Sequence, residues 1–225
     1  DVSPDFTMLE QNELNMIEND IVNEILEEVY GDNTPDSNAL LELFSNGRND
    51  INLISSIFQI YKFSVSSANP LKWIEDHFAY YFEDVPVEQT LWGKYSIERV
   101  KSILEYIITK CDKILIDAGD DNKVGVTTRN SIIGAVTDMK YALDLINSGG
   151  KWDDIKKIID NLKINGFGNF KAAEKDDLYY EISGRTKALT KDFASLASIM
   201  TCYSEDFKKD IQYLRPIILA FKNCV

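Results

Sequence analysis

Residues 59–74 read Gln-Ile-Tyr-Lys-Phe-Ser-Val-Ser-Ser-Ala-Asn-Pro-Leu-Lys-Trp-Ile, and this stretch holds the clearest local signal in the chain. Its order predicts the end of one amphipathic helix, a short Ser/Asn break, and a second helix that begins at Pro70. Proline is favoured at the first helical position because its missing N–H needs no partner there. We expect Trp73, on the first turn of the second helix, to pack and set the angle between the two helices.

Outward from this stretch, apolar residues recur at helical spacing along nearly the whole chain. The first predicted helix places Leu14, Ile17, Ile21, Ile25 and Val29 on one face, with glutamates beside them. Helices are expected at about 9–30, 36–45, 50–66, 70–82, 90–118, 128–147, 151–162, 175–202 and 204–222. No strand alternation of useful length occurs. The sequence therefore predicts an all-α fold, about nine helices in an orthogonal array with long antiparallel pairs.

The domain organisation follows from the same pattern. We expect a single all-helical domain over residues 1–225, with possible sub-lobes 1–84 and 90–225 around a linker at 83–89. The chain starts with Asp1 rather than Met and stops at Val225, directly after an apolar helix-like run. These ends predict an insertion domain excised from a larger protein.

Composition points to a folded protein of the cytoplasm. The chain is 44% hydrophobic and 27% charged, and it has no apolar run of about 18 residues that would predict a membrane span. No signal peptide is expected at the N-terminus. Cys111, Cys202 and Cys224 are odd in number and far apart, which fits a reducing compartment. With His77 as the single histidine and no Cys-x-x-Cys pair, we expect no metal site.

The net charge of −13 is unevenly distributed. Residues 1–100 carry 5 Lys/Arg and 19 Asp/Glu, whereas residues 101–225 carry 19 and 18. The first half should therefore repel nucleic acid, while the second half could bind a phosphate backbone locally. The alternative interpretation is that the asymmetry is a solvated acidic face.

No catalytic or cofactor motif is found in the sequence. A P-loop needs Gly-x-x-x-x-Gly-Lys-Ser/Thr, and neither Gly93-Lys94 nor Gly150-Lys151 has the required neighbours. Gly166-Phe167-Gly168 lacks the preceding strand of a dinucleotide site. The carboxylate pairs Asp153-Asp154 and Asp176-Asp177 fall at predicted helix starts, where they favour the positive end of the helix dipole. We predict no catalytic, cofactor-binding or metal-binding residues in this chain.

The stretch from Lys151 to Lys191 is the most basic of the chain, with nine Lys/Arg and seven interleaved acids. One interpretation is a phosphate-contacting edge, with Phe167 and Phe170 against a sugar or base. The other is a mixed-charge helix surface whose loop aromatics plug the core. The first interpretation yields five candidate DNA contacts: Lys163, Lys171, Arg185, Lys187 and Lys191.

Several segments, taken in order, carry a family resemblance. They are Asp1-Val2-Ser3-Pro4-Asp5-Phe6-Thr7, Glu27-Glu28-Val29-Tyr30, Leu40-Leu41-Glu42-Leu43-Phe44, Gly47-Arg48-Asn49-Asp50, Ile60-Tyr61-Lys62-Phe63 through Trp73-Ile74, Trp152-Asp153-Asp154-Ile155, Arg185-Thr186-Lys187 and Leu214-Arg215-Pro216-Ile217-Ile218. This order resembles the AddA subunit of bacterial AddAB helicase–nucleases, of the UvrD/PcrA-like superfamily 1. The chain departs from the family pattern at Thr7, Ala68 and Ile74, where the family has Arg, Pro and Leu.

The resemblance implies that this chain is one part of a larger enzyme. Such a region is the inserted 1B subdomain, an all-helical module that helps hold duplex DNA ahead of the unwinding junction. The parent would be an ATP-dependent 3′→5′ DNA helicase and exonuclease, a hydrolase using ATP and Mg²⁺, in double-strand-break repair and recombination with an AddB-like subunit.

Two other functions stay open. The first is an acidic all-helical interaction module that docks a partner subunit or the rest of the helicase motor. The second is an independent metal-dependent enzyme that uses paired carboxylates.

Overall fold

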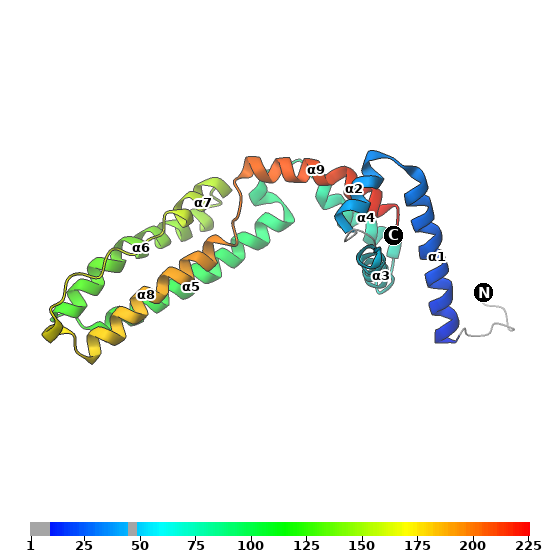
Figure 1. Ribbon diagram of the computed structural model, residues 1–225. Helices are drawn as coiled ribbons and strands as arrows, with labels where there is room; N and C mark the ends of the chain where they lie inside the picture. Colours follow the sequence, from blue (N-terminus) through cyan, green and yellow to red (C-terminus); the bar gives the residue numbers. More distant parts are fainter. Residues whose placement is uncertain (1–9, 45–48) are drawn as a thin grey trace. The chain divides into compact units, whose positions relative to one another are not determined.

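The computed structural model describes residues 10–44 and 49–225, and within these ranges the chain is helical with no strand (Figure 1). The predicted all-α fold class is confirmed for this part of the chain. The motif at residues 1–7 and the first two residues of the motif at 47–50 lie outside the described residues. The described helices are α1 (Gln11–Asp32), α2 (Pro35–Phe44), α3 (Ile51–Val65), α4 (Pro70–Ala79), α5 (Leu91–Ala118), α6 (Lys123–Asn147), α7 (Trp152–Asp160), α8 (Asp177–Ala197) and α9 (Ser204–Lys222). Short 3₁₀ turns lie at Tyr80–Phe82, Val87–Gln89 and Ala172–Glu174.

The break between α3 and α4 forms as the sequence predicts. The side chain of Asn69 accepts a hydrogen bond from the Lys72 N–H at 3.1 Å, and Pro70 is the first residue of α4. Trp73 is half-buried and packs against the neighbouring core, with its ring stacked on His77 at a centroid distance of 3.9 Å. Helix start signals in the sequence, here Asn followed by Pro, therefore place this boundary correctly.

The described residues fold into two compact units, one of residues 10–44, 49–83 and 210–225 and the other of residues 84–209. The first unit is discontinuous in sequence, because the later part of α9 completes its core. Phe221 stacks on Phe44 at 5.4 Å between ring centroids and lies 6.1 Å from Phe78. Arg215 donates hydrogen bonds from Nε to the Tyr81 carbonyl (2.9 Å) and from Nη2 to the Glu83 carbonyl (3.0 Å).

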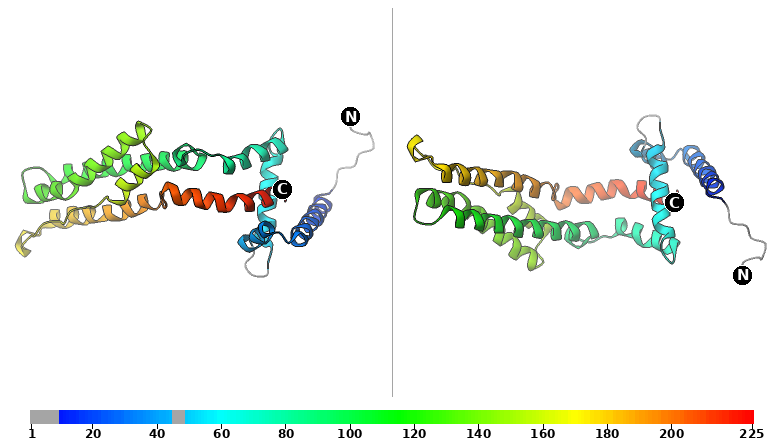
Figure 2. Two further views of the ribbon diagram at one scale, coloured as in Figure 1. Left: turned by 90° about the horizontal axis from the view of Figure 1, so that it is seen from above. Right: turned by 90° about the horizontal axis from the view of Figure 1, so that it is seen from below.

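The second unit is built on three long helices, α5, α6 and α8, with α7 packed against α6 and α8 (Figure 2). Its core contains fully buried aliphatic side chains from each of these helices, among them Leu104, Ile132, Ile155 and Leu189. Two ion pairs join α5 to α8: Lys110 with Asp192 at 2.6 Å, and Arg185 with Asp117 at 2.8 Å. Because the residue numbers rise along α5 as they fall along α8, the two helices are antiparallel, as the sequence predicts.

The turn between α5 and α6 is tight and depends on two glycines. Gly119 has φ +74°, a conformation that L side chains rarely adopt. The side chain of Asn122 accepts from the Gly125 N–H at 2.8 Å and donates to the Ala118 carbonyl at 2.7 Å. A Cβ on Gly125 would collide with the carbonyl group of Gly119, whereas a Cβ on Gly134 of the same helix would meet no atom within 4 Å.

This contrast predicts opposite effects of one substitution at two positions of α6. Gly125→Ala should lower the free energy of unfolding by about 1–3 kcal/mol, because backbone must move to admit the methyl group. Gly134→Ala should raise it by about 1 kcal/mol, the helix propensity difference between the two residues. Urea denaturation followed by circular dichroism measures both. Equal effects at the two positions would contradict the tight turn.

Candidate nucleic-acid interface

All five candidate DNA contacts lie in the second unit, but in different settings. Lys163 and Lys171 lie in the segment between α7 and α8, whereas Arg185, Lys187 and Lys191 lie on α8. Arg185 is half-buried and the four lysines are exposed.

Lys187 and Lys191 are the two basic residues of α8 that are exposed and form no ion pair with a described carboxylate. They are one turn apart, and the positions that α8 buries, among them Ile182, Leu189 and Phe193, lie on its other side. Within the described ranges, neither ammonium group has a carboxylate within ion-pair distance. Both charges are therefore available to an anion that approaches α8 from solvent.

Arg185 has a structural role already. Its Nη1 donates to Asp117 at 2.8 Å and to Glu181 at 3.1 Å, and these carboxylates offset its charge. The hydrogen bond to Asp117 raises the pKa of Arg185, so the guanidinium stays charged. A phosphate would have to compete with both carboxylates for this side chain. Arg185 stays a predicted contact, but its observed contacts hold α8 against α5.

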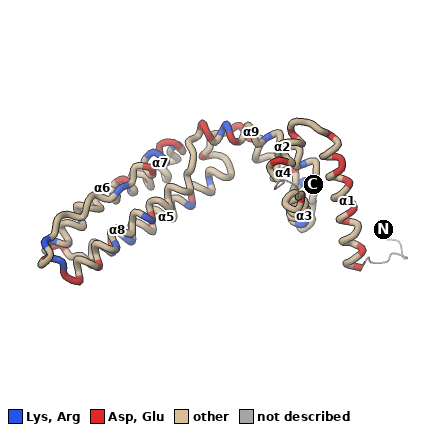
Figure 3. The backbone as a smooth tube through the Cα atoms, in the orientation of Figure 1, with Lys and Arg blue, Asp and Glu red and all other residues tan. Residues whose placement is uncertain are grey.

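The positions of the ion-paired residues on α5 bring in two exposed residues that the sequence did not single out as DNA contacts. Lys113 is exposed and lies one turn from Lys110 and one turn from Asp117, so it shares the side of α5 that faces α8. Tyr106, one turn before Lys110, is 62% exposed on the same side. On α8, Arg185 and Asp192 are the residues that pair with α5, and Lys187 and Lys191 lie about 100–160° round the helix from them, on its solvent side. We use the name α5–α8 face for the four exposed residues of these two helices, Tyr106, Lys113, Lys187 and Lys191. Figure 3 shows the basic residues spaced along these two helices.

The segment between α7 and α8 lies against α6. The Asn165 N–H donates to the Ser131 carbonyl at 2.9 Å, and its side-chain amide donates to the Asn130 carbonyl at 3.3 Å. Lys163, two residues earlier, is therefore on the α6 side of the unit rather than on the α5–α8 face.

The aromatic residues of this segment pack inward. Phe170 lies 5.9 Å from Phe167 and 4.7 Å from Tyr179 between ring centroids, and all three are half-buried against the core. Lys123 lies over the Phe170 ring at 4.7 Å and pairs with Glu174 at 2.7 Å, and its hydrogen bond lowers the pKa of Glu174. This geometry supports the interpretation that the loop aromatics plug the end of the core.

The paired carboxylates lie at the starts of α7 and α8, as predicted, but the N-cap of α7 is Lys151, with no side-chain hydrogen bond. Asp176 accepts from the Tyr179 N–H at 2.9 Å and caps α8. Asp153, in the first turn of α7, accepts from both the N–H (2.8 Å) and the hydroxyl (2.6 Å) of Ser204, at the start of α9. Among the described residues, no group of three or more His, Cys, Asp or Glu could hold a metal ion.

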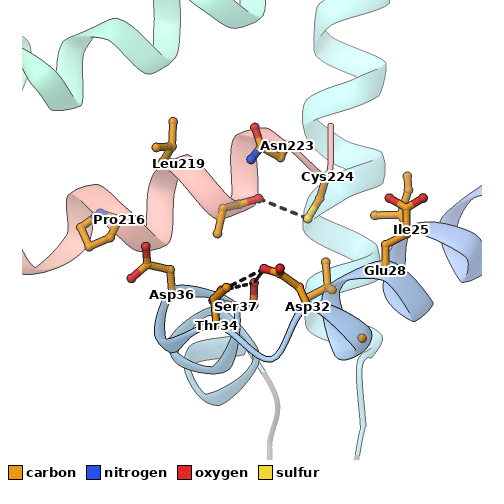
Figure 4. A pocket seen from close by; sticks show the side chains of 13 residues that line it. Ile25, Glu28, Asp32, Thr34, Asp36, Ser37, Pro216, Leu219, Asn223 and Cys224 are labelled. Atoms are coloured by element: carbon orange, nitrogen blue, oxygen red, sulfur yellow. Dashed lines mark hydrogen bonds between the residues drawn. The ribbon is translucent and has the colours of Figure 1, made fainter.

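A pocket of about 690 Å³ lies in the first unit, between the α1–α2 turn and α9 (Figure 4). Its polar groups are used locally: Asp32 accepts from the hydroxyls of Ser37 (2.7 Å) and Thr34 (2.9 Å), and these bonds lower the pKa of Asp32. The Cys224 thiol donates to the Ala220 carbonyl at 3.4 Å, and burial raises its pKa. A thiol with a raised pKa is a poor nucleophile, so this pocket suggests no reaction.

A buried thiol in the second unit is equally inert, since burial raises the pKa of Cys111 to about 11.

In the described part of the chain, no helix is both long and apolar enough to cross a membrane.

Comparison with known proteins gives one consistent result. The chain is similar to the A subunits of ATP-dependent helicase/nucleases from Ruminiclostridium cellulolyticum (20% identity, all of this chain and 18% of the relative), Listeria monocytogenes serotype 4b (23%, all of this chain and 18% of the relative) and Clostridium perfringens (26%, 78% of this chain and 14% of the relative). No model of a known protein family matches the chain. The resemblance expected from the sequence motifs is thereby confirmed, and the chain spans less than a fifth of the length of these relatives.

The packing of Phe170 leads to a prediction that separates the two interpretations of the loop aromatics. Phe170→Ala should lower the free energy of unfolding by about 1–3 kcal/mol, less than for a fully buried phenylalanine, because the ring is only half-buried. The neighbouring exposed Lys171→Ala should change it by less than about 0.5 kcal/mol. Thermal unfolding checks both variants. An unchanged stability for Phe170→Ala together with weaker DNA binding would show that the ring contacts nucleic acid instead.

Proposed function

We propose that this chain is the all-helical accessory segment of an ATP-dependent helicase/nuclease subunit of the AddA kind, and that its second unit contacts duplex DNA ahead of the unwinding junction. The observation that carries the proposal is similarity over the whole chain to the helicase/nuclease A subunits of Ruminiclostridium cellulolyticum and Listeria monocytogenes. In this view the whole protein is a cytoplasmic 3′→5′ helicase and exonuclease that acts with an AddB-like subunit in double-strand-break repair and recombination.

ATP and Mg²⁺ would be bound elsewhere in that protein. The chain has no Gly-x-x-x-x-Gly-Lys-Ser/Thr sequence to cradle phosphates. The described residues also offer no cluster of three metal-ligating side chains. The residues present therefore do not fit either group, and the function of this segment is binding rather than chemistry.

The charges support the second unit as the DNA-contacting part. Residues 84–209 carry 19 Lys/Arg and 20 Asp/Glu, a net of −1. Residues 1–83 and 210–225, which contain the first unit, carry 5 and 17, a net of −12. A phosphate backbone is therefore repelled by the first unit and meets a nearly neutral surface on the second, where local basic groups decide the interaction.

The α5–α8 face is one such local surface. Lys113, Lys187 and Lys191 are exposed cations, and within the described ranges no carboxylate pairs with them. Each lysine that neutralises a phosphate releases counterions, which makes binding favourable at low salt. Tyr106 adds an exposed ring at the edge of the same face.

A second candidate function, docking to protein, is favoured by the first unit. Its first helix carries no Lys or Arg at all and leaves several large apolar side chains exposed. The two functions are compatible because they use different units.

The DNA-contact proposal predicts a charge-dependent loss of affinity. The variant Lys113→Gln/Lys187→Gln/Lys191→Gln should bind forked duplex DNA more weakly at low salt. Its plot of log affinity against log salt should be shallower by about 0.9 for each phosphate that the variant no longer neutralises. A fluorescence-anisotropy titration of the 225-residue chain over a salt series measures both quantities.

The matched control makes the same charge change on the first unit, as Lys62→Gln/Lys72→Gln/Lys222→Gln. It should leave the salt slope unchanged. If both triple variants lose affinity equally, net charge and not the α5–α8 face governs binding, and the assignment fails. The double variant Lys163→Gln/Lys171→Gln tests the two remaining predicted contacts in the same assay.

A further inference from the structure

The N-terminal half of α1 exposes an apolar stripe that the described residues of its own unit, 10–44, 49–83 and 210–225, leave open. Leu14, Ile17 and Ile21 are 38%, 44% and 50% exposed. In the C-terminal half of the same helix, Ile25 and Val29 continue this side and are half-buried against the core of the first unit. The face that the sequence predicts to be apolar is thus partly covered over one half of the helix and open over the other.

The stripe has the spacing of a docking surface. Leu14, Ile17 and Ile21 follow one another by three and four residues, so they line one side of the helix. Glutamates flank the stripe, Glu13 and Glu24 on one side and Glu18 on the other. The opposite side of the helix carries asparagines, including Asn19 and Asn23, both exposed.

The charge of α1 limits which kind of molecule could bind the apolar stripe. Residues 10–32 contain eight Asp/Glu and no Lys or Arg. A second copy of α1 would bring like charges together, and nucleic acid or an anionic lipid surface would be repelled. What complements an apolar stripe with acidic borders is a protein groove with an apolar floor and a rim of Lys and Arg.

We propose that this stripe docks into such a groove on another region of the same, longer polypeptide. The inference rests on the proposed function, in which the chain is one segment of an AddA-like protein. The Ruminiclostridium cellulolyticum relative has more than four fifths of its length outside the matched region. An intrachain partner is held at high effective concentration, so it needs a lower intrinsic affinity than a separate protein would to occupy a stripe of three apolar residues.

Site-specific photo-cross-linking tests the docking directly. The photoreactive residue p-benzoylphenylalanine replaces Ile17 in the protein expressed from its complete gene, and mass spectrometry identifies the attached peptide. We expect an intramolecular cross-link to a peptide outside these 225 residues that contains apolar residues beside Lys or Arg. The same probe at Asn23, on the opposite side of the helix, should give a yield several times lower.

A charge reversal adds a second readout that keeps the helix and its apolar residues. Glu13→Lys/Glu18→Lys/Glu24→Lys, combined with the probe at Ile17, should reduce the cross-link severalfold, because the rim contacts become repulsive. The proposal is overturned if the cross-link yields at positions 17 and 23 are equal, or if no cross-linked product forms. It is also overturned if the product contains a second copy of the protein or a separate polypeptide. Its failure is distinct from that of the DNA-contact proposal, since the Lys113/Lys187/Lys191 variant does not touch α1.

Discussion

The burial of Phe221 and Ile217 among the side chains of α2, α3 and α4 is the contact on which the architecture depends. These two residues are 7% and 2% exposed, and Phe221 meets both Phe44 and Phe78. Their partners lie well over 100 residues earlier, so the first unit can close only after the second has been traversed. The second unit is therefore an insertion within the first. Loop-closure entropy grows only slowly with loop length, so an insertion of this size is tolerated.

Two separate cores allow two surfaces of different chemistry. The first unit holds nearly all of the net negative charge, whereas the second is close to neutral. If the acids were spread evenly, every part of the chain would carry a net negative charge and would be less favourable to a phosphate backbone. Their concentration in the first unit is what the two proposed roles require: a nearly neutral second unit that DNA could approach, and an acidic α1 for a basic protein groove. Within the second unit, the hydrogen bonds from the N–H and hydroxyl of Ser204 to Asp153 lie at the start of α9.

The positions of the helices are predictable from the sequence, but which helices pack together and which side chains pair are not. Periodicity, together with the Asn69-Pro70 start signal, predicted helices close to those observed, because the 3.6-residue repeat and capping are local properties. Periodicity shows which side of a helix is apolar but not what covers it, so residues 210–225 could not be assigned to the first unit. For the same reason the uncovered half of the α1 stripe was not foreseen. Arg185 looked free in the sequence because its partner Asp117 is 68 residues away, and Lys113 was missed because it lies outside the basic stretch.

Hydrogen exchange in the presence and absence of forked duplex DNA at low salt tests most directly whether the two units have separate roles. We predict that DNA slows amide exchange in residues 106–117 of α5 and 185–197 of α8, the helices of the α5–α8 face, and leaves residues 11–32 of α1 unchanged. Slowed exchange in α1, or unchanged exchange throughout the second unit at a DNA concentration that saturates binding, would contradict this account.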